Sequence, residues 1–270
     1  MNLSKNLQKN IATIKNLIIS DDVVYFDFLV NQVKAVCVYT DNICDKVLIG
    51  KQVIEPLTYL KKDFSLNAVL NTILLPEIEK VNTFEKCVNS LINGDGIILF
   101  DGLDTAISVA SKKSSSRMVS EPPTSSVLKG PREGFVENIQ TNMNLVRQRL
   151  KSPDLTYKKF TIGKYSKTLV GLVYISSIAD EKIVKDVESK LSKINVDGVI
   201  DSSYIIKSIG TRKTSLFKEV GTTEKPDVLV SKLLEGRIAI IVDGSPIVLT
   251  LPFVLIEDFQ SSEDYYVNNY

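Results

Sequence analysis

Carboxylates are the side chains of this sequence that are best placed to do chemistry, because its 270 residues include no histidine. The carboxylates that stand out are Asp101, Asp104, Asp243, Glu257 and Asp258. Paired carboxylates can act as acid and base in glycoside hydrolysis or can bind a hard cation. However, Asp101 and Asp243 each precede a glycine between apolar runs, where turn chemistry explains an aspartate. Without histidine the commonest general base is missing, so we expect no enzyme and no catalytic residues.

Cofactor and metal motifs are also absent from the sequence. Cys37, Cys44 and Cys87 are an odd set without a C-x-x-C pair, which is typical of isolated buried thiols rather than of disulfides or zinc ligands. No glycine-rich phosphate motif occurs, since the glycines at 94 and 96 lead into an apolar strand instead of a helix. The sequence therefore predicts no cofactor and no metal site.

One segment, residues 111–130, differs in composition from the rest of the chain. It is rich in serine, proline and basic residues, as linkers are, and it separates residues 1–110 from residues 131–270. Its charges could contact nucleic acid or anionic lipid headgroups, but no aromatic residues are interleaved with them. The whole chain has 33 basic and 32 acidic side chains, so no general attraction to nucleic acid is expected and a solvated hinge is favoured.

The two halves carry matching landmarks. Gly94–Gly102 and Gly236–Gly244 each read as a glycine, an apolar run and an Asp-Gly turn, followed by a second apolar run. Earlier in each half an apolar strand precedes an aspartate that suits a helix start, namely Asp45 and Asp180. The pattern predicts a mixed α/β (α+β) fold with two α/β subdomains of similar topology, each closed by a β-hairpin. Chance likeness between two ordinary α/β units is the alternative.

The start of the second half carries the least ordinary residues. Pro131 suits the first turn of a helix, so we expect a helix over residues 132–150. Arg147 and Arg149 are two positions apart and must point to different sides of that helix. We expect internal carboxylates to hold one of them and a partner to hold the other, because arginine suits bidentate pairing. Ordinary solvated charge is the alternative.

Several motifs give the sequence a family resemblance. They are RMVSEP at 117–122, GPREGF at 130–135, TNMNLVRQRL at 141–150, LVYISSIADEKIV at 172–184, EKPD at 224–227, LLEGRIAIIVDGSP at 233–246 and SSEDYY at 261–266. In these motifs the chain resembles the A subunits of GerA-type spore germinant receptors, and SpoVAF-type relatives share the core motifs. The resemblance is dense from Arg117 onwards and weaker over residues 1–116.

The resemblance implies a non-enzymatic role in receptor assembly and signal coupling during germination. It implies a soluble region of two α/β subdomains, facing the cytoplasm or spore core, that precedes a membrane region missing from this chain. The expected location is the spore inner membrane, and the expected partners are the receptor B and C subunits, sister A subunits in a homo-oligomer and a nutrient germinant. The alternative is a binding module that holds an amino acid or sugar in a cleft between the lobes.

No catalytic residues come with this resemblance. It implies subdomain or subunit contacts at a set of motif positions in the linker, the segment after it and the following helix. These positions are Arg117, Glu121, Arg132, Glu133, Phe135, Asn142, Arg147 and Arg149.

Overall fold

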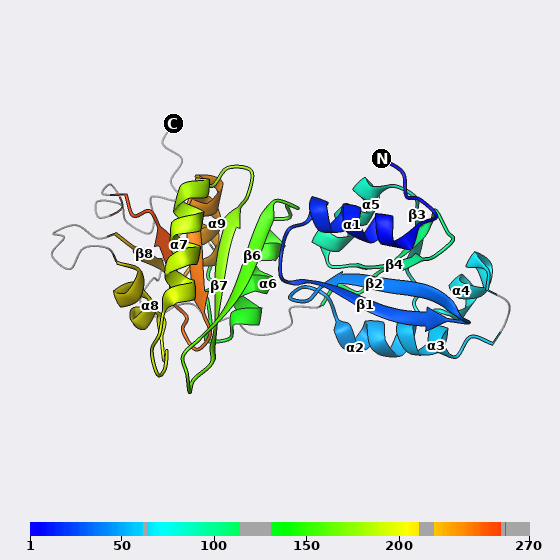
Figure 1. Cartoon of the computed structure of the whole chain (residues 1–270), viewed down its shortest axis with the longest axis horizontal. Coiled ribbons are helices and arrows are strands. Elements are labelled where there is room, and N and C mark those ends of the chain that lie inside the picture. The colour runs from blue at the N-terminus through cyan, green and yellow to red at the C-terminus, as the bar shows by residue number, and fades with distance from the viewer. Residues whose placement is uncertain (62–63, 114–130, 211–218, 255–256, 258–270) are drawn as a thin grey trace. The chain divides into compact units, whose positions relative to one another are not determined.

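The computed structural model describes residues 1–61, 64–113, 131–210, 219–254 and 257. The chain forms two compact units, each with its own sheet (Figure 1). The described residues of unit 1 lie within Met1–Ser115 and Lys151–Pro153, and those of unit 2 within Ser116–Leu150 and Asp154–Tyr270.

Unit 1 is a five-stranded antiparallel sheet with the strand order β1-β2-β4-β5-β3. Its strands are β1 (Val23–Val30), β2 (Val33–Thr40), β3 (Ile78–Val81), β4 (Gly96–Phe100) and β5 (Ala106–Val109). Its helices are α1 (Leu7–Leu17), α2 (Lys46–Ile49), the π-helical turn η1 (Gly50–Ile54), α3 (Glu55–Thr58), α4 (Leu66–Thr72) and α5 (Phe84–Asn93). Asn31 and Gln32, both with positive φ, form the tight turn between β1 and β2.

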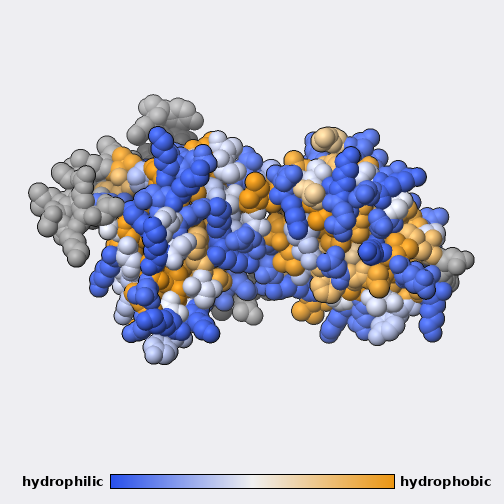
Figure 2. Space-filling view, viewed as in Figure 1, coloured by the Kyte–Doolittle hydropathy of each residue, from blue (hydrophilic) through white to orange (hydrophobic). Residues whose placement is uncertain are grey.

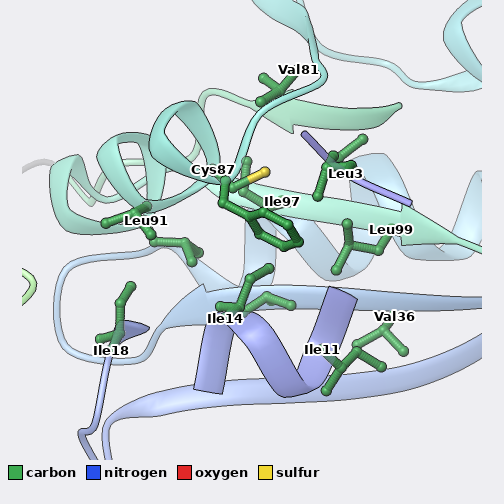
Figure 3. Packing of buried hydrophobic residues seen from close by; sticks show 14 of the residues in the cluster. Leu3, Ile11, Ile14, Ile18, Val36, Val81, Cys87, Leu91, Ile97 and Leu99 are labelled. Carbon is green, nitrogen blue, oxygen red and sulfur yellow. The ribbon is translucent and has the colours of Figure 1, made fainter. Parts of the chain in front are cut away.

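Helices cover both faces of this sheet (Figure 1). On one face, α1 and α5 direct Ile14 and Leu91 against Ile97 and other sheet residues, as Figure 3 shows. On the other face, the helices between β2 and β3 bury Val53 and others against the sheet. Central strands such as β4 are therefore buried on both faces, which explains their continuous apolar sequence.

Unit 2 repeats this plan with the strand order β6-β7-β9-β10-β8, again antiparallel. Its strands are β6 (Leu155–Ile162), β7 (Thr168–Ile175), β8 (Gly221–Thr223), β9 (Ile238–Val242) and β10 (Val248–Leu251). Its helices are α6 (Ile139–Arg149), α7 (Glu181–Lys193), α8 (Ser202–Ile209) and α9 (Pro226–Leu234). Helices α6 and α9 pack on one face of the sheet, and α7 and α8 pack on the other.

The predicted fold class is confirmed, because both units have the same strand order and both end in a hairpin at an Asp-Gly turn. Asp45 and Asp180 cap the helices α2 and α7 as expected. The subdomain limits of 1–110 and 131–270 stay a prediction, since most of the linker lies outside the described residues.

The helix predicted over residues 132–150 is wrong in its first part. Residues 131–138 are not helical, and α6 begins only at Ile139. Asn138 supplies the N-cap, since its side chain accepts the backbone N–H of Thr141. Pro131 therefore lies well before the helix and does not open it.

Hydrophilic residues cover most of the visible face of each unit, with hydrophobic residues between them (Figure 2). This agrees with apolar cores enclosed by helix layers on both sides of each sheet. Within the described residues, no helix combines the length and the apolar character that crossing a membrane requires.

Candidate functional site

The segment 131–138 leads into α6 and is here called the lead-in segment. Phe135 is buried in the core of unit 2, and its backbone N–H donates to the carbonyl of Glu224 over 2.7 Å. Glu224 belongs to the EKPD motif, just before α9. The structure thus joins two of the motifs by a backbone contact that fixes where the chain enters unit 2.

Asn142 clasps the lead-in segment from α6. Its side chain is fully buried, accepts the N–H of Val136 over 2.8 Å and donates to the carbonyl of the same residue over 2.6 Å. A primary amide carries both a donor and an acceptor, so it can pair with both polar groups of one backbone residue. This contact, here called the asparagine clasp, explains why asparagine stands at this position.

The two arginines of α6 diverge, as their spacing predicts. Arg147 has a 3% exposed side chain and donates to the carbonyl of Leu155 at the start of β6 over 3.3 Å. Arg149 donates to the carbonyl of Leu145 over 3.0 Å and forms an ion pair with Glu133 of the lead-in segment. Both arginines thus make contacts inside unit 2, and a partner for either one stays a prediction.

The predicted contact positions therefore fall into three groups. Phe135, Asn142 and Arg147 are buried and hold α6 and the lead-in segment in place. Three others are accessible: Arg132 and Glu133 are exposed, and Arg149 is partly exposed. Arg117 and Glu121 lie outside the described residues.

Each of the two turn aspartates binds the start of a helix in its own unit. The Asp243 carboxylate accepts the N–H of Ile139, the first residue of α6, over 3.0 Å. In unit 1, Asp101 accepts the N–H of Leu7, the first residue of α1, over 3.3 Å. A carboxylate at a helix start satisfies an otherwise unpaired donor and suits the helix dipole. These aspartates therefore stabilise helix starts, a role that the turn interpretation missed.

Unit 1 has its own asparagine clasp. Asn10 of α1 is buried, accepts the N–H of Ser4 over 2.9 Å and donates to the carbonyl of Ser4 over 2.6 Å. Asn10 did not stand out from the sequence. The signal was available, because Asn-x-x-x-Asn occurs at Asn6 and Asn10 and again at Asn138 and Asn142.

The three cysteines are all buried. Burial raises the pKa of the Cys37 thiol, so the thiol stays protonated and is a poor nucleophile. No group of three or more acidic or cysteine side chains that could hold a metal ion occurs in the described part of the chain. The contacts around α6 position the lead-in segment and anchor the start of unit 2.

Two hollows are open on unit 1. One, of about 370 Å³, lies between α1 and the β1–β2 hairpin and includes Leu7, Asp27 and Lys34 in its lining. The other, of about 360 Å³, lies beside β3 and includes Glu77, Asp95 and Ser108. Burial and the nearby Glu77 raise the pKa of Asp95, although a backbone hydrogen bond with Ser111 and the charge of Lys112 oppose the shift.

Comparison with solved structures gives a match over almost the whole chain. The crystal structure of the N-terminal domain of the A subunit of the Bacillus megaterium spore germinant receptor GerK3 matches with a TM-score of 0.69 and 29% sequence identity. The match covers 95% of this chain and 98% of that one. At this identity and coverage the two chains share the two-unit fold.

Sequence relatives come from the same group of proteins. Spore germination protein KA of Bacillus subtilis (strain 168) is 35% identical over 272 residues, which is 98% of this chain and 50% of that protein. Stage V sporulation protein AF of the same strain is 32% identical over 232 residues, 84% of this chain and 47% of that protein. The chain thus spans about half the length of these relatives, and both expected branches match it.

The sequence model of the family described as Bacillus/Clostridium GerA spore germination protein matches residues 8–270. The match includes residues 8–116, where the motifs alone gave only a weak resemblance. On this evidence the chain belongs to the GerA family of spore germination proteins.

Proposed function

We propose that the chain is the N-terminal domain of a spore germinant receptor A subunit and that it acts, without catalysis, in receptor assembly and signal coupling. The observation that carries the proposal is the match to the N-terminal domain of such a subunit over 95% of the chain. Relatives named for spore germination support the process. The motif residues support a non-catalytic role, because those that are described hold the fold of unit 2 or lie on its surface.

The proposal includes partners and a location. The domain works with the receptor B and C subunits and with sister A subunits, and a nutrient germinant is the signal that the assembly answers. A membrane region of the full protein holds it in the spore inner membrane, with the domain facing the spore core. These details rest on the family resemblance.

The accessible motif residues are the proposed contact surface. Arg132, Glu133 and Arg149 lie on or near the lead-in segment, and the ion pair between Glu133 and Arg149 orders two of them. The buried Asn142 and Phe135 keep this segment in one conformation. A surface held in one conformation loses less entropy when a partner binds.

Reversing the charge of Arg132 tests this surface. We expect Arg132→Glu in the full-length protein to reduce co-purification of the receptor B and C subunits from spore membranes by about tenfold, because like charge replaces an attractive contact. The melting temperature of the purified 270-residue chain should stay within about 2 °C of wild type, since exposed substitutions rarely change stability. Lys9→Glu, at an exposed position on α1, is the matched control and should leave both values unchanged. Wild-type co-purification of Arg132→Glu would remove this residue from the contact surface.

The alternative function, binding of an amino acid or sugar, has one supporting observation in the two hollows of unit 1. Calorimetric titration of the purified chain with a panel of amino acids and sugars tests it. If germinant sensing belongs to another subunit, no compound in the panel binds below millimolar concentration. Binding that is lost in Asp95→Asn, with the fold intact, would favour the alternative and place the ligand in the second hollow.

A further inference from the structure

A buried ionic cluster lies where the chain leaves the sheet of unit 2. The Glu257 carboxylate forms ion pairs with Lys232 of α9 and with Arg237, which directly precedes β9. These three side chains are only 8%, 4% and 11% exposed. Lys232 also lies 3.4 Å from the hydroxyl of Thr250 in β10. We call Lys232, Arg237 and Glu257 the exit clamp.

The backbone after β10 makes hydrogen bonds at and next to this clamp. The N–H of Val254 donates to the Glu257 carboxylate over 2.9 Å, and the N–H of Phe253 donates to the carbonyl of Glu219 over 3.2 Å. Gly221 lies beneath the clamp, where a Cβ atom would come within 2.7 Å of the Thr250 hydroxyl and 3.2 Å of the Glu257 carboxylate. A glycine at this position therefore makes room for the carboxylate.

The clamp keeps Glu257 ionised. Burial by itself raises the pKa of Glu257, but hydrogen bonds from Lys232 and Val254 and the charges of Lys232 and Arg237 outweigh it. The net effect holds the pKa of this carboxyl below its usual range. Removing one member of a buried ion pair is strongly unfavourable, because the remaining charges are left without compensation.

Unit 1 has the same backbone framework but not the same charges. The N–H of Asp95 donates to the carbonyl of Ser90 after α5, as the N–H of Arg237 donates to the carbonyl of Lys232 after α9. Serine thus stands in place of Lys232, and aspartate stands in place of Arg237. Neither cation of the clamp therefore has a counterpart at the equivalent position of unit 1.

The strand register also shows that unit 1 lacks the residues of the clamp. Thr250 pairs with Gly221 of β8, and at the corresponding place in unit 1 Ser108 pairs with Glu79 of β3. The residue that makes room for the carboxylate in unit 2 is therefore a glutamate in unit 1. Since both units fold to the same strand order without sharing these residues, the shared fold does not require the clamp.

We propose that the exit clamp fixes the path of the chain out of unit 2 and transmits movements of this unit to whatever follows Glu257. The inference rests on the proposed function, because coupling needs a rigid connection between the domain and the rest of the receptor. A rigid joint transmits displacement, whereas an unanchored segment absorbs it.

Hydrogen exchange on the 270-residue chain tests the joint itself. Glu257→Gln should speed exchange of the Phe253 and Val254 amides by about tenfold, because the charged acceptor and the ion pairs are lost together. Exchange in β6, at the opposite edge of the sheet from β8, should stay as in wild type. Glu235→Gln is the matched control, since it removes only the half-exposed partner of the same arginine, Arg237. Unchanged exchange in Glu257→Gln overturns the proposal.

A second variant covers the case in which Glu257→Gln fails to fold. Gly221→Ala keeps all three charges and pushes a Cβ atom against the clamp, so it should speed exchange at the same two amides. If Glu257→Gln does not fold, unchanged exchange in Gly221→Ala overturns the proposal by itself.

A germination assay distinguishes failure of this inference from failure of the proposed function. Spores that carry Glu257→Gln in the full-length protein should hold normal amounts of receptor and co-purify its subunits, yet lose optical density in nutrient about tenfold more slowly. If germination proceeds at the wild-type rate although amide exchange is faster, the coupling role of the clamp is contradicted and the receptor assignment stays intact. If deletion of the whole gene left germination unchanged, the proposed function itself would fail.

Discussion

Gly171→Ala is expected to destabilise unit 2 by about 3 kcal/mol, which lowers its melting temperature by about 10 °C. Gly171 lies in β7 directly under the ring of Tyr157, and a Cβ atom there would come within 2.1 Å of Cε2 of that ring. Tyr157 is 2% exposed and packed into the core of unit 2, so a shift of its ring would disturb the core side chains around it. A buried clash of this kind forces strained rotamers or backbone shifts.

Two variants make this prediction specific, both followed by thermal unfolding. Gly50→Ala is the control, because Gly50 is helical and a Cβ atom there meets nothing within 4 Å. It should be neutral or stabilise unit 1 by up to about 1 kcal/mol. Tyr157→Leu should recover part of the stability that Gly171→Ala loses, by removing the ring. A melting temperature of Gly171→Ala equal to wild type would mean that Tyr157 does not occupy this position.

Asn142→Ala is expected to destabilise unit 2 by about 2–4 kcal/mol, because it leaves two partly buried backbone groups of Val136 without their partner. Asn10→Ala should have the same effect in unit 1 through Ser4. Asn142→Asp keeps the acceptor but loses the donor and places a charge in the core, so it should not rescue the clasp.

Hydrogen exchange resolved by residue tests the clasp in each unit. Asn142→Ala should speed exchange in α6 more than in α1, and Asn10→Ala should do the reverse. Urea unfolding of the same variants gives the free energies of unfolding. Equal acceleration in both units by either variant would contradict a clasp that acts within its own unit.

Features that depend on neighbouring residues were predictable from the sequence. Both closing hairpins follow from Asp-Gly turns, because the turn needs a positive φ that glycine adopts without strain. Gly102 and Gly244 have φ values of 85° and 87°. Asp45 and Asp180 were likewise visible as helix caps, since a cap depends only on the next few residues.

Features that depend on distant partners were not predictable. Pro131 indicated a helix start, but the lead-in segment is not helical and is bound at Phe135 to the backbone of Glu224, which lies far along the chain. Glu257 stood out only as one carboxylate among several, because nothing in the spacing reveals that folding brings Lys232 and Arg237 to it.

The asparagine clasps lie between these cases. Each joins residues six positions apart, so local reasoning could have reached them, yet one copy alone looks like an ordinary polar helix residue. Comparing the two halves reveals the repeated Asn-x-x-x-Asn spacing. The duplicated topology is thus a source of information about single residues.

The role as a receptor A subunit is tested most directly by affinity purification of the full-length, tagged protein from spore membranes. The proposed function predicts that the receptor B and C subunits and untagged sister copies co-purify with it in defined proportions. Recovery of the protein from spores without B, C or sister copies would contradict assembly into a germinant receptor.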